Sequence, residues 1–275
     1  GGQCIRVAQD WRTVSIKLLE ADGQWGWSRP LKLKSRLRRL GVAAGDALSP
    51  TLVQDGARVA LACPVQCARP PVVRTSTRIC AVDVGINTAA TASIVDERGT
   101  VIARRFFSCG RHNDRRDKLA AAIRRKAAQT KTLAKGFCAR LYRRIRGLNT
   151  QAAREMAHEL RAFAAEHGAT VLVFEHLKNW RPKSPRVSMR QRFHRFLHRA
   201  FVKSVTHQAE EDGRKVAFVA AWGTSAWAYD GSGKVQRQKK NYSLCEFING
   251  RRFNADLNAS FNIAAKYLAR VLKIV

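Results

Sequence analysis

Acidic residues are scarce in this sequence of 275 residues. Twenty Asp and Glu stand against 51 Lys and Arg, which leaves a formal net charge of +31 at pH 7. Such an imbalance is too large for an ordinary solvated surface and implies a polyanionic partner. No stretch reaches the roughly 18 consecutive apolar residues of a spanning helix, so nucleic acid is a better candidate than a membrane. We expect no membrane partner.

The seven cysteines lack the pattern of a structural framework. They are odd in number and scattered, without the paired spacing of disulfides or of a structural zinc site. Cys63 and Cys67 form one pair with no second pair nearby. We therefore expect reduced thiols and a cytoplasmic protein.

The size and the ends of the chain set its organisation. A hydrophobic content of 45% in 275 residues is enough for a sizeable core, in one large domain or two modest ones. The chain opens at Gly1, shortly before a strand-like run, and closes at Val275 within a helical pattern. We expect it to be part of a longer polypeptide.

Residues 1–73 contain short runs with the two-residue alternation of strands, separated by a basic, turn-rich segment. This pattern predicts part of a small β-barrel. Pro70 and Pro71, followed by polar residues, have the composition of a domain boundary.

Residues 79–275 alternate strands with helices. Residues 79–108 predict an antiparallel meander, and apolar residues at three-and-four spacing from 119 to 148 predict one long basic helix or two. A further helix at 150–168, ending at Gly168, precedes a buried strand that we expect to return to the same sheet. Helices at 190–212 and 254–272, with a strand at 215–223 between them, complete an α/β domain with a mixed sheet.

Two carboxylates interrupt apolar strands. Asp83 lies in the first strand and Glu175 ends the strand after Gly168. A buried acid is costly unless it is paired or bound to a metal, although backbone amides at a strand end could also satisfy each one. Asp256 follows Asn254, a plausible helix cap, so the helix dipole alone could explain it. Together the three acids predict a site for two Mg²⁺ or Mn²⁺ ions about 4 Å apart, suited to phosphodiester hydrolysis.

Four motifs in order carry a resemblance to a known family. They are VDVGIN at 82–87, VFEHL at 173–177, GTS at 223–225 and NADLNASFNIA at 254–264. This order resembles the split RuvC domain of TnpB-type transposon-encoded nucleases and of type V CRISPR effectors (RuvC-containing, Cas12-like). The resemblance covers about residues 79–269 and implies a RuvC/RNase H-like fold with Asp83, Glu175 and Asp256 as its catalytic, metal-binding acids.

The same resemblance implies the remaining domains and partners. Residues 1–73 look like part of the wedge or oligonucleotide-binding domain that precedes RuvC in the family, and residues 226–252 like its target nucleic-acid-binding insertion. The implied activity is that of an RNA-guided DNA endonuclease with a guide RNA and target DNA, the latter as heteroduplex and single strand. Thr224 and Ser225 become possible supports of the site.

The insertion departs from the family pattern. Ala228, Gly231 and Ile248 stand at positions of the two Cys-x-x-Cys knuckles, and only Cys245 remains near them. Four zinc ligands cannot be assembled, so we expect no zinc. Trp227, Tyr229, Tyr242 and Phe247 could replace the metal by aromatic packing.

Basic runs recur along the chain, and the small number of acids favours phosphate contact over a solvated surface. The candidate nucleic-acid-binding residues are Arg36, Arg38, Arg39, Arg115, Arg116, Arg124, Arg125, Arg143, Arg144, Arg186, Arg190, Arg192, Lys239 and Lys240.

Two alternative functions remain open at this point. A guided protein that binds DNA without cutting it would share every feature except active acids. A guide-independent RuvC-like junction or RNA nuclease would share the metal chemistry but need no RNA-binding N-terminal part. A small RNA that copurifies with the protein would favour a guided function over the last.

Overall fold

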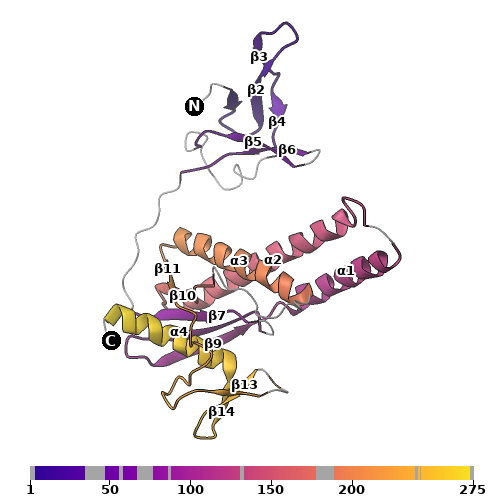
Figure 1. Ribbon diagram of the computed structural model, residues 1–275. Coiled ribbons are helices and arrows are strands. Elements are labelled where there is room, and N and C mark those ends of the chain that lie inside the picture. The colour runs from indigo at the N-terminus through magenta and orange to yellow at the C-terminus, as the bar shows by residue number, and fades with distance from the viewer. Residues whose placement is uncertain are drawn as a thin grey trace. The chain divides into compact units, whose positions relative to one another are not determined.

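In a computed structural model the chain divides into two units, Gly1–Ala68 and Arg69–Val275 (Figure 1). The structure describes residues 4–34, 47–55, 58–66, 77–85, 88–130, 133–177, 189–238, 241 and 243–272, without the side chains of 55, 58, 189–197 and 272.

The first unit is built from antiparallel strands. β2 (Thr13–Leu19) pairs with β1 (Ile5–Val7), β3 (Trp25–Trp27) and β4 (Leu31–Lys32). β5 (Thr51–Asp55) and β6 (Arg58–Ala62) form a separate hairpin. The predicted strands are confirmed, while the described residues form a four-stranded sheet and a two-stranded one, so the barrel stays a prediction.

The second unit is organised around a mixed five-stranded sheet. Its strands are β7 (Ile79–Asp83), β8 (Ala90–Val95), β9 (Val101–Phe107), β10 (Val171–Glu175) and β11 (Lys215–Val219), in the spatial order β11-β10-β7-β8-β9. β7, β8 and β9 are antiparallel neighbours, whereas β10 runs parallel to both β7 and β11. The predicted meander and the predicted return of the strand after Gly168 are both confirmed.

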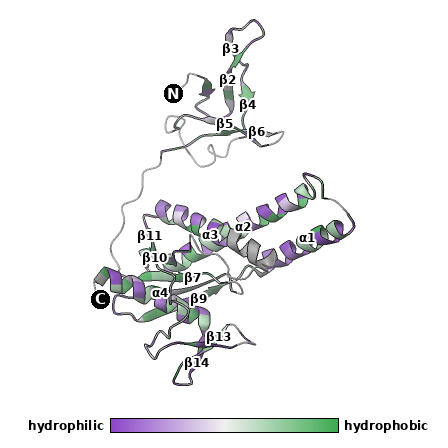
Figure 2. Cartoon of the chain, viewed as in Figure 1, coloured by the Kyte–Doolittle hydropathy of each residue, from purple (hydrophilic) through white to green (hydrophobic). Residues whose placement is uncertain are grey.

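Side chains alternate between the two faces of this sheet. Cys80 and Val82 pack in a core with residues of α2 (Ala139–Glu166) and α3 (Met189–Glu211), whereas Ile79 and Ala81 pack in a second core with α4 (Ala255–Leu272). Helices therefore cover both faces, as Figure 1 shows. Figure 2 shows β7 as hydrophobic and the helices as amphipathic, as expected of a sheet buried between two layers.

The long basic segment forms two helices, and the predicted break between 148 and 150 is wrong. α1 (Gly110–Ala128) is followed by α2, which continues without interruption to Glu166. One glycine, Gly147, costs a helix about 1 kcal/mol, and burial of Ile145 and Ala152 on either side offsets that cost. The predicted end at Gly168 is confirmed, with φ 67° there.

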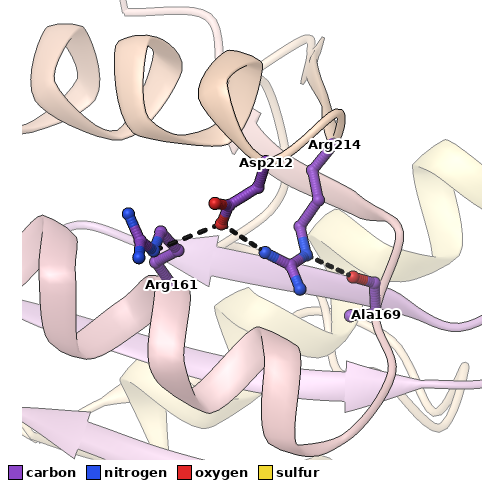
Figure 3. A network of polar contacts seen from close by, with 4 residues as sticks. All are labelled: Arg161, Ala169, Asp212 and Arg214. Atoms are coloured by element: carbon purple, nitrogen blue, oxygen red, sulfur yellow. Dashed lines mark hydrogen bonds and ion pairs between the residues drawn. The ribbon is translucent and has the colours of Figure 1, made fainter. Parts of the chain in front are cut away.

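A polar network joins α2 to the turn after α3 (Figure 3). Asp212 Oδ2 lies 3.2 Å from Arg161 Nε on α2 and 2.5 Å from an Arg214 guanidinium nitrogen. Arg214 Nε also donates to the Ala169 carbonyl at 3.1 Å. The network ties the starts of β10 and β11 to α2, which fixes the crossover that brings these strands side by side.

None of the helices within the described ranges is long and apolar enough to cross a bilayer.

Arg116, predicted to contact nucleic acid, is instead buried and structural. Its side chain is 5% exposed, and its guanidinium donates to Asn149 Oδ1 at 3.3 Å and to Asn113 Oδ1 at 2.7 Å. The bond to Asn149 links α1 to α2, and the bond to Asn113 lies within α1. The basic run did not reveal that one member of the Arg115–Arg116 pair points inward.

We predict that Arg116→Ala lowers the free energy of unfolding by about 1–3 kcal/mol, because it removes buried hydrogen bonds and leaves Asn149 without that partner. The neighbouring exposed Arg115 is the matched control, and Arg115→Ala should change stability by less than about 0.5 kcal/mol. Urea unfolding followed by circular dichroism measures both. Equal stabilities of the two variants would contradict the structural role.

Candidate active site

Two of the predicted acids lie at adjacent strand ends on one face. Phe174 pairs with Val82 in the parallel β7–β10 ladder, so Glu175 and Asp83 follow at the carboxyl ends of both strands. Asp83 is two residues beyond Ala81 and Glu175 two beyond Val173, so each acid lies on the same face of the sheet as its neighbour. Ala81 and Val173 pack towards α4. The sheet register therefore directs both carboxylates to the α4 face.

The third acid arrives with the start of α4. Asn254 Oδ1 accepts hydrogen bonds from the Asp256 and Leu257 amides at 3.0 and 2.9 Å, which confirms the predicted cap. Asp256 thus lies in the first helical turn. Its carboxyl carbon is 3.9 Å from the position that a Cβ at Gly85 would take, just beyond β7.

Gly85 is required at this point by close packing. A Cβ there would lie 2.7 Å from the Thr88 carbonyl oxygen, a contact that real Cβ atoms do not make. Thr88 in turn hydrogen bonds to the Asp256 side chain. The glycine lets the chain after β7 fold back so that Thr88 can hold this acid.

The three carboxylates are partly buried, and Asp83 is influenced by the charges of the other two. Burial raises the pKa of Asp83 well above its usual range, and the negative charges of Glu175 and Asp256 raise it further. Burial also raises the pKa of Glu175 and of Asp256. Arg237 on β12 (Gln236–Arg237) opposes the shifts at Asp83 and Asp256.

Glu175 is held by Thr224, a residue named from the GTS motif. Thr224 is buried, and its hydroxyl contacts Glu175 Oε1 and lies 2.9 Å from the Ala221 carbonyl oxygen. The hydrogen bond that the Thr224 hydroxyl donates to Glu175 lowers the pKa of this carboxyl and so opposes the effect of burial. Ser225 is exposed.

A polar stripe on α4 holds the loop that carries Thr224. The stripe consists of Asn258, Asn262 and Lys266, four residues apart. Asn258 Nδ2 donates to the Trp227 carbonyl at 2.8 Å, and Asn262 Nδ2 to the Thr224 carbonyl at 2.9 Å. Lys266 Nζ donates to the Ala220 carbonyl at 3.1 Å and also to the Trp222 carbonyl. One helix thus positions Asp256 directly and Glu175 through Thr224.

The sequence interpretation missed the stripe, together with Thr88 and Arg237. The stripe had a signal, since three polar residues recur at four-residue spacing along a largely apolar helix. Thr88 and Arg237 had none, because their proximity to the acids depends on the folding of irregular segments.

No three Asp, Glu, His or Cys side chains within the described residues are arranged as a metal site as they stand. The donor chemistry still suits a hard cation, because three carboxylates offer oxygen ligands. The hydrogen bonds from Thr224 and Thr88 hold two of these carboxylates.

The insertion before α4 has an aromatic core. β12 pairs with β13 (Leu244–Glu246), which pairs with β14 (Arg252–Asn254). The Tyr229 ring lies 5.7 Å from that of Phe247 and 5.0 Å from that of Phe261, centroid to centroid. Packing of Tyr229 and Phe247 is therefore confirmed, Trp227 is 40% exposed, and Tyr242 lies outside the described residues.

The basic candidates divide into three groups, of which the buried one is Arg116 alone. The exposed ones are Arg115, Arg124, Arg125, Arg143 and Arg144, on α1 and α2. Arg36, Arg38, Arg39, Arg186, Lys239 and Lys240 lie outside the described residues, as do the side chains of Arg190 and Arg192.

The raised pKa of Asp83 predicts a pH-dependent stability. The folded state retains this proton where the unfolded chain has released it, so stability falls as pH rises from 3.8 through the raised pKa. In chelator at neutral pH, Asp83→Asn should raise the melting temperature, and the gain should shrink towards pH 4. Asp117→Asn, on the exposed surface of α1, is the control. A gain that does not depend on pH would contradict the prediction.

The insertion should be stable without zinc, as its sequence predicts. Elemental analysis of the purified protein should find zinc well below one ion per chain, and a zinc chelator should leave the melting temperature unchanged. Phe247→Ala should lower the unfolding free energy by about 3–5 kcal/mol, the cost of removing a buried aromatic ring. Stoichiometric zinc would contradict the prediction.

Comparisons with known proteins locate this fold. No family model and no curated protein matches the sequence. Among solved structures, the Cas12f1–sgRNA–target DNA complex matches with a TM-score of 0.53 and 14% identity, over 95% of this chain and 67% of that chain. The AacC2c1–sgRNA binary complex matches at 0.52 and 10%, over 96% and 49%. A CRISPR–Cas12f ternary complex matches at 0.51 and 16%, over 78% and 44%.

The chain thus spans about half the length of the last two proteins. At these identities the likeness is one of fold, and it extends over most of this chain. Over most of its length the chain has the fold of part of the Cas12f and C2c1 proteins.

Proposed function

We propose that this chain belongs to an RNA-guided DNA endonuclease whose active site consists of Asp83, Glu175 and Asp256. The observation that carries the proposal is that three carboxylates, distant in sequence, gather at the carboxyl ends of β7 and β10. There the negative charges of Glu175 and Asp256 raise the pKa of Asp83. A structural role would favour separate, neutralised carboxylates, whereas here burial raises the pKa of all three although Arg237 and Lys266 lie near enough to oppose the shifts.

The sheet supports a RuvC/RNase H-like assignment. An antiparallel meander leads into parallel strands through helical crossovers, and the acids stand at the ends of β7 and β10 and at the start of α4. This is the arrangement expected from the order of the four sequence motifs. The domain would therefore carry its chemistry at the carboxyl ends of the two central parallel strands.

Asp83, Glu175 and Asp256 would hold Mg²⁺ or Mn²⁺. Such ions, when bound, activate a water molecule and stabilise the leaving oxygen of a phosphodiester. The chain's own residues keep the acids in place: Thr88 and Thr224 restrain two of them, and α4 restrains Thr224. Since the side chains do not form a metal site as they stand, binding requires rotation of at least one carboxylate.

Guide RNA and target DNA are the proposed partners. A guide RNA (sgRNA) is present in both the Cas12f1 and the AacC2c1 complexes, and target DNA in the first of them. The net charge of +31 and the exposed arginines of α1 and α2 supply phosphate contacts. Sequence specificity would then come from base pairing with the guide rather than from these side chains.

A guided binder that does not cut is the second candidate. It would share the fold and the exposed arginines of α1 and α2, and would differ only in whether the three acids act. Such a protein would bind matched DNA and leave it intact with any divalent cation.

We predict that Asp83→Ala abolishes Mg²⁺-dependent cutting of matched DNA by the full-length protein with its copurifying RNA. DNA affinity should stay within a factor of about 3, because phosphate contacts by Lys and Arg supply most of it. Asp117→Ala is the control. Cutting by Asp83→Ala at the wild-type rate would refute the assigned site.

Thermal unfolding gives a readout independent of activity. Mg²⁺ at about 100 times its Kd should stabilise the wild type by about 2.7 kcal/mol and leave Asp83→Ala unaffected. A wild-type protein that gains no stability from Mg²⁺ or Mn²⁺ and does not cut would favour the binding-only function.

A further inference from the structure

Trp222 is the most exposed large hydrophobic side chain in the described part of the chain, with 79% of its surface accessible. It lies three residues beyond the end of β11, at the sheet edge where the carboxylates gather. An isolated exposed ring is ordinary on a protein surface, so its surroundings decide whether it has a role.

Those surroundings hold Trp222 in place without covering it. Lys266 Nζ donates to the Trp222 carbonyl and lies 5.7 Å from the centroid of its ring. Lys266 therefore holds Trp222 by a hydrogen bond to the Trp222 backbone and by a cation–π contact with the Trp222 ring. The ring is thus presented to solvent by a residue of the polar stripe that also positions the active site.

A second tryptophan flanks the same loop. Trp227 is 40% exposed, with Lys234 Nζ 5.7 Å from its ring centroid. Its ring packs on the backbone of Gly223, where a Cβ would lie 3.1 Å from Trp227 Cδ1. Gly223 also has φ 81°, so a side chain here is excluded by both conformation and space. Two rings, each with a lysine, therefore bracket Gly223 and Thr224.

The loop that carries the two tryptophans is next to the candidate active site. Thr224 contacts Glu175 directly, and the Cα atoms of Trp222 and Thr224 are at most about 7 Å apart, so Trp222 belongs to the loop that touches one of the acids. Lys266 and Arg237 add positive charge beside the acids, and Lys234 lies over the ring of Trp227. The combination of a free ring and nearby cations suits a base and its phosphates.

We infer that Trp222 is a stacking platform for an unpaired base of the nucleic acid strand that enters the active site. The inference rests on the proposed function and names how that site takes its substrate. A single strand is specified because the bases of a duplex are already stacked and present no free face to an aromatic ring. Stacking tolerates any base, as a guided enzyme requires.

The test measures binding without cutting. The full-length protein in chelator, at about 0.3 M salt to weaken phosphate contacts, is titrated with a labelled single-stranded DNA, the same sequence as RNA, and a blunt DNA duplex. Trp222→Ala should weaken single-strand binding about 5- to 150-fold, the loss expected for one stacked base, and leave duplex binding within about twofold. Trp222→Phe should retain most of the affinity, and Phe106→Ala, which removes a 48% exposed aromatic ring on β9, should retain all of it.

Intrinsic fluorescence gives a second readout if Trp222→Ala does not fold. Single-stranded DNA should quench wild-type tryptophan emission more than that of Trp222→Phe. Equal losses for DNA and RNA support a platform that accepts either strand, and a loss for DNA alone supports a DNA platform. Unchanged binding by Trp222→Ala, a loss for Trp222→Phe as large as for Trp222→Ala, or equal quenching overturns the inference. These assays do not depend on cutting, so an inactive protein that still needs Trp222 for binding overturns the proposed function alone.

Discussion

Like charges repel at the carboxyl ends of β7 and β10, and much of the surrounding structure offsets that repulsion. Asp83 is the most affected, because burial and the charges of Glu175 and Asp256 all disfavour its ionised form. Folding energy gained elsewhere, in two hydrophobic cores on opposite faces of the sheet, holds the acids together. Such local destabilisation in an otherwise well-packed domain is typical of functional sites.

α4 connects the stability of the domain to the geometry of the site. Its apolar residues Ile263, Ala264 and Tyr267 pack on the sheet, its first turn carries Asp256, and its polar stripe holds the loop of Thr224 and Trp222. Serine hydroxyls on β8 and α4, Ser93 and Ser260, lie 2.6 Å apart inside this contact. The buried pair favours one axial position of the helix over others, since any shift would leave both hydroxyls without this partner.

The sequence allowed the strands and the helix cap at Asn254 to be predicted, because each depends on local pattern, whereas the catalytic role of the three acids stays a prediction. Apolar runs broken by one carboxylate are rare enough to identify, and Gly168 ended its helix as expected. The continuity of α2 through Gly147 could not be predicted, since tertiary burial of Ile145 and Ala152 outweighs local propensity. Arg116 was misread for a similar reason: only the packing of α1 on α2 distinguishes it from Arg115. Thr88 and Arg237 depend on irregular segments, where no periodicity guides a prediction.

The strict alternation of β7 and β10 has a consequence for how such a domain can vary. Inserting one residue before Asp83 within β7 would carry that carboxylate to the opposite side of the sheet, among the apolar side chains facing α2 and α3. Length changes are therefore confined to connections outside the two strands, such as the segment between β9 and β10 or the one between β11 and α4. Proteins with this fold can therefore differ in the length of these two connections, whereas the number of residues within β7 and β10 before each acid cannot change by one.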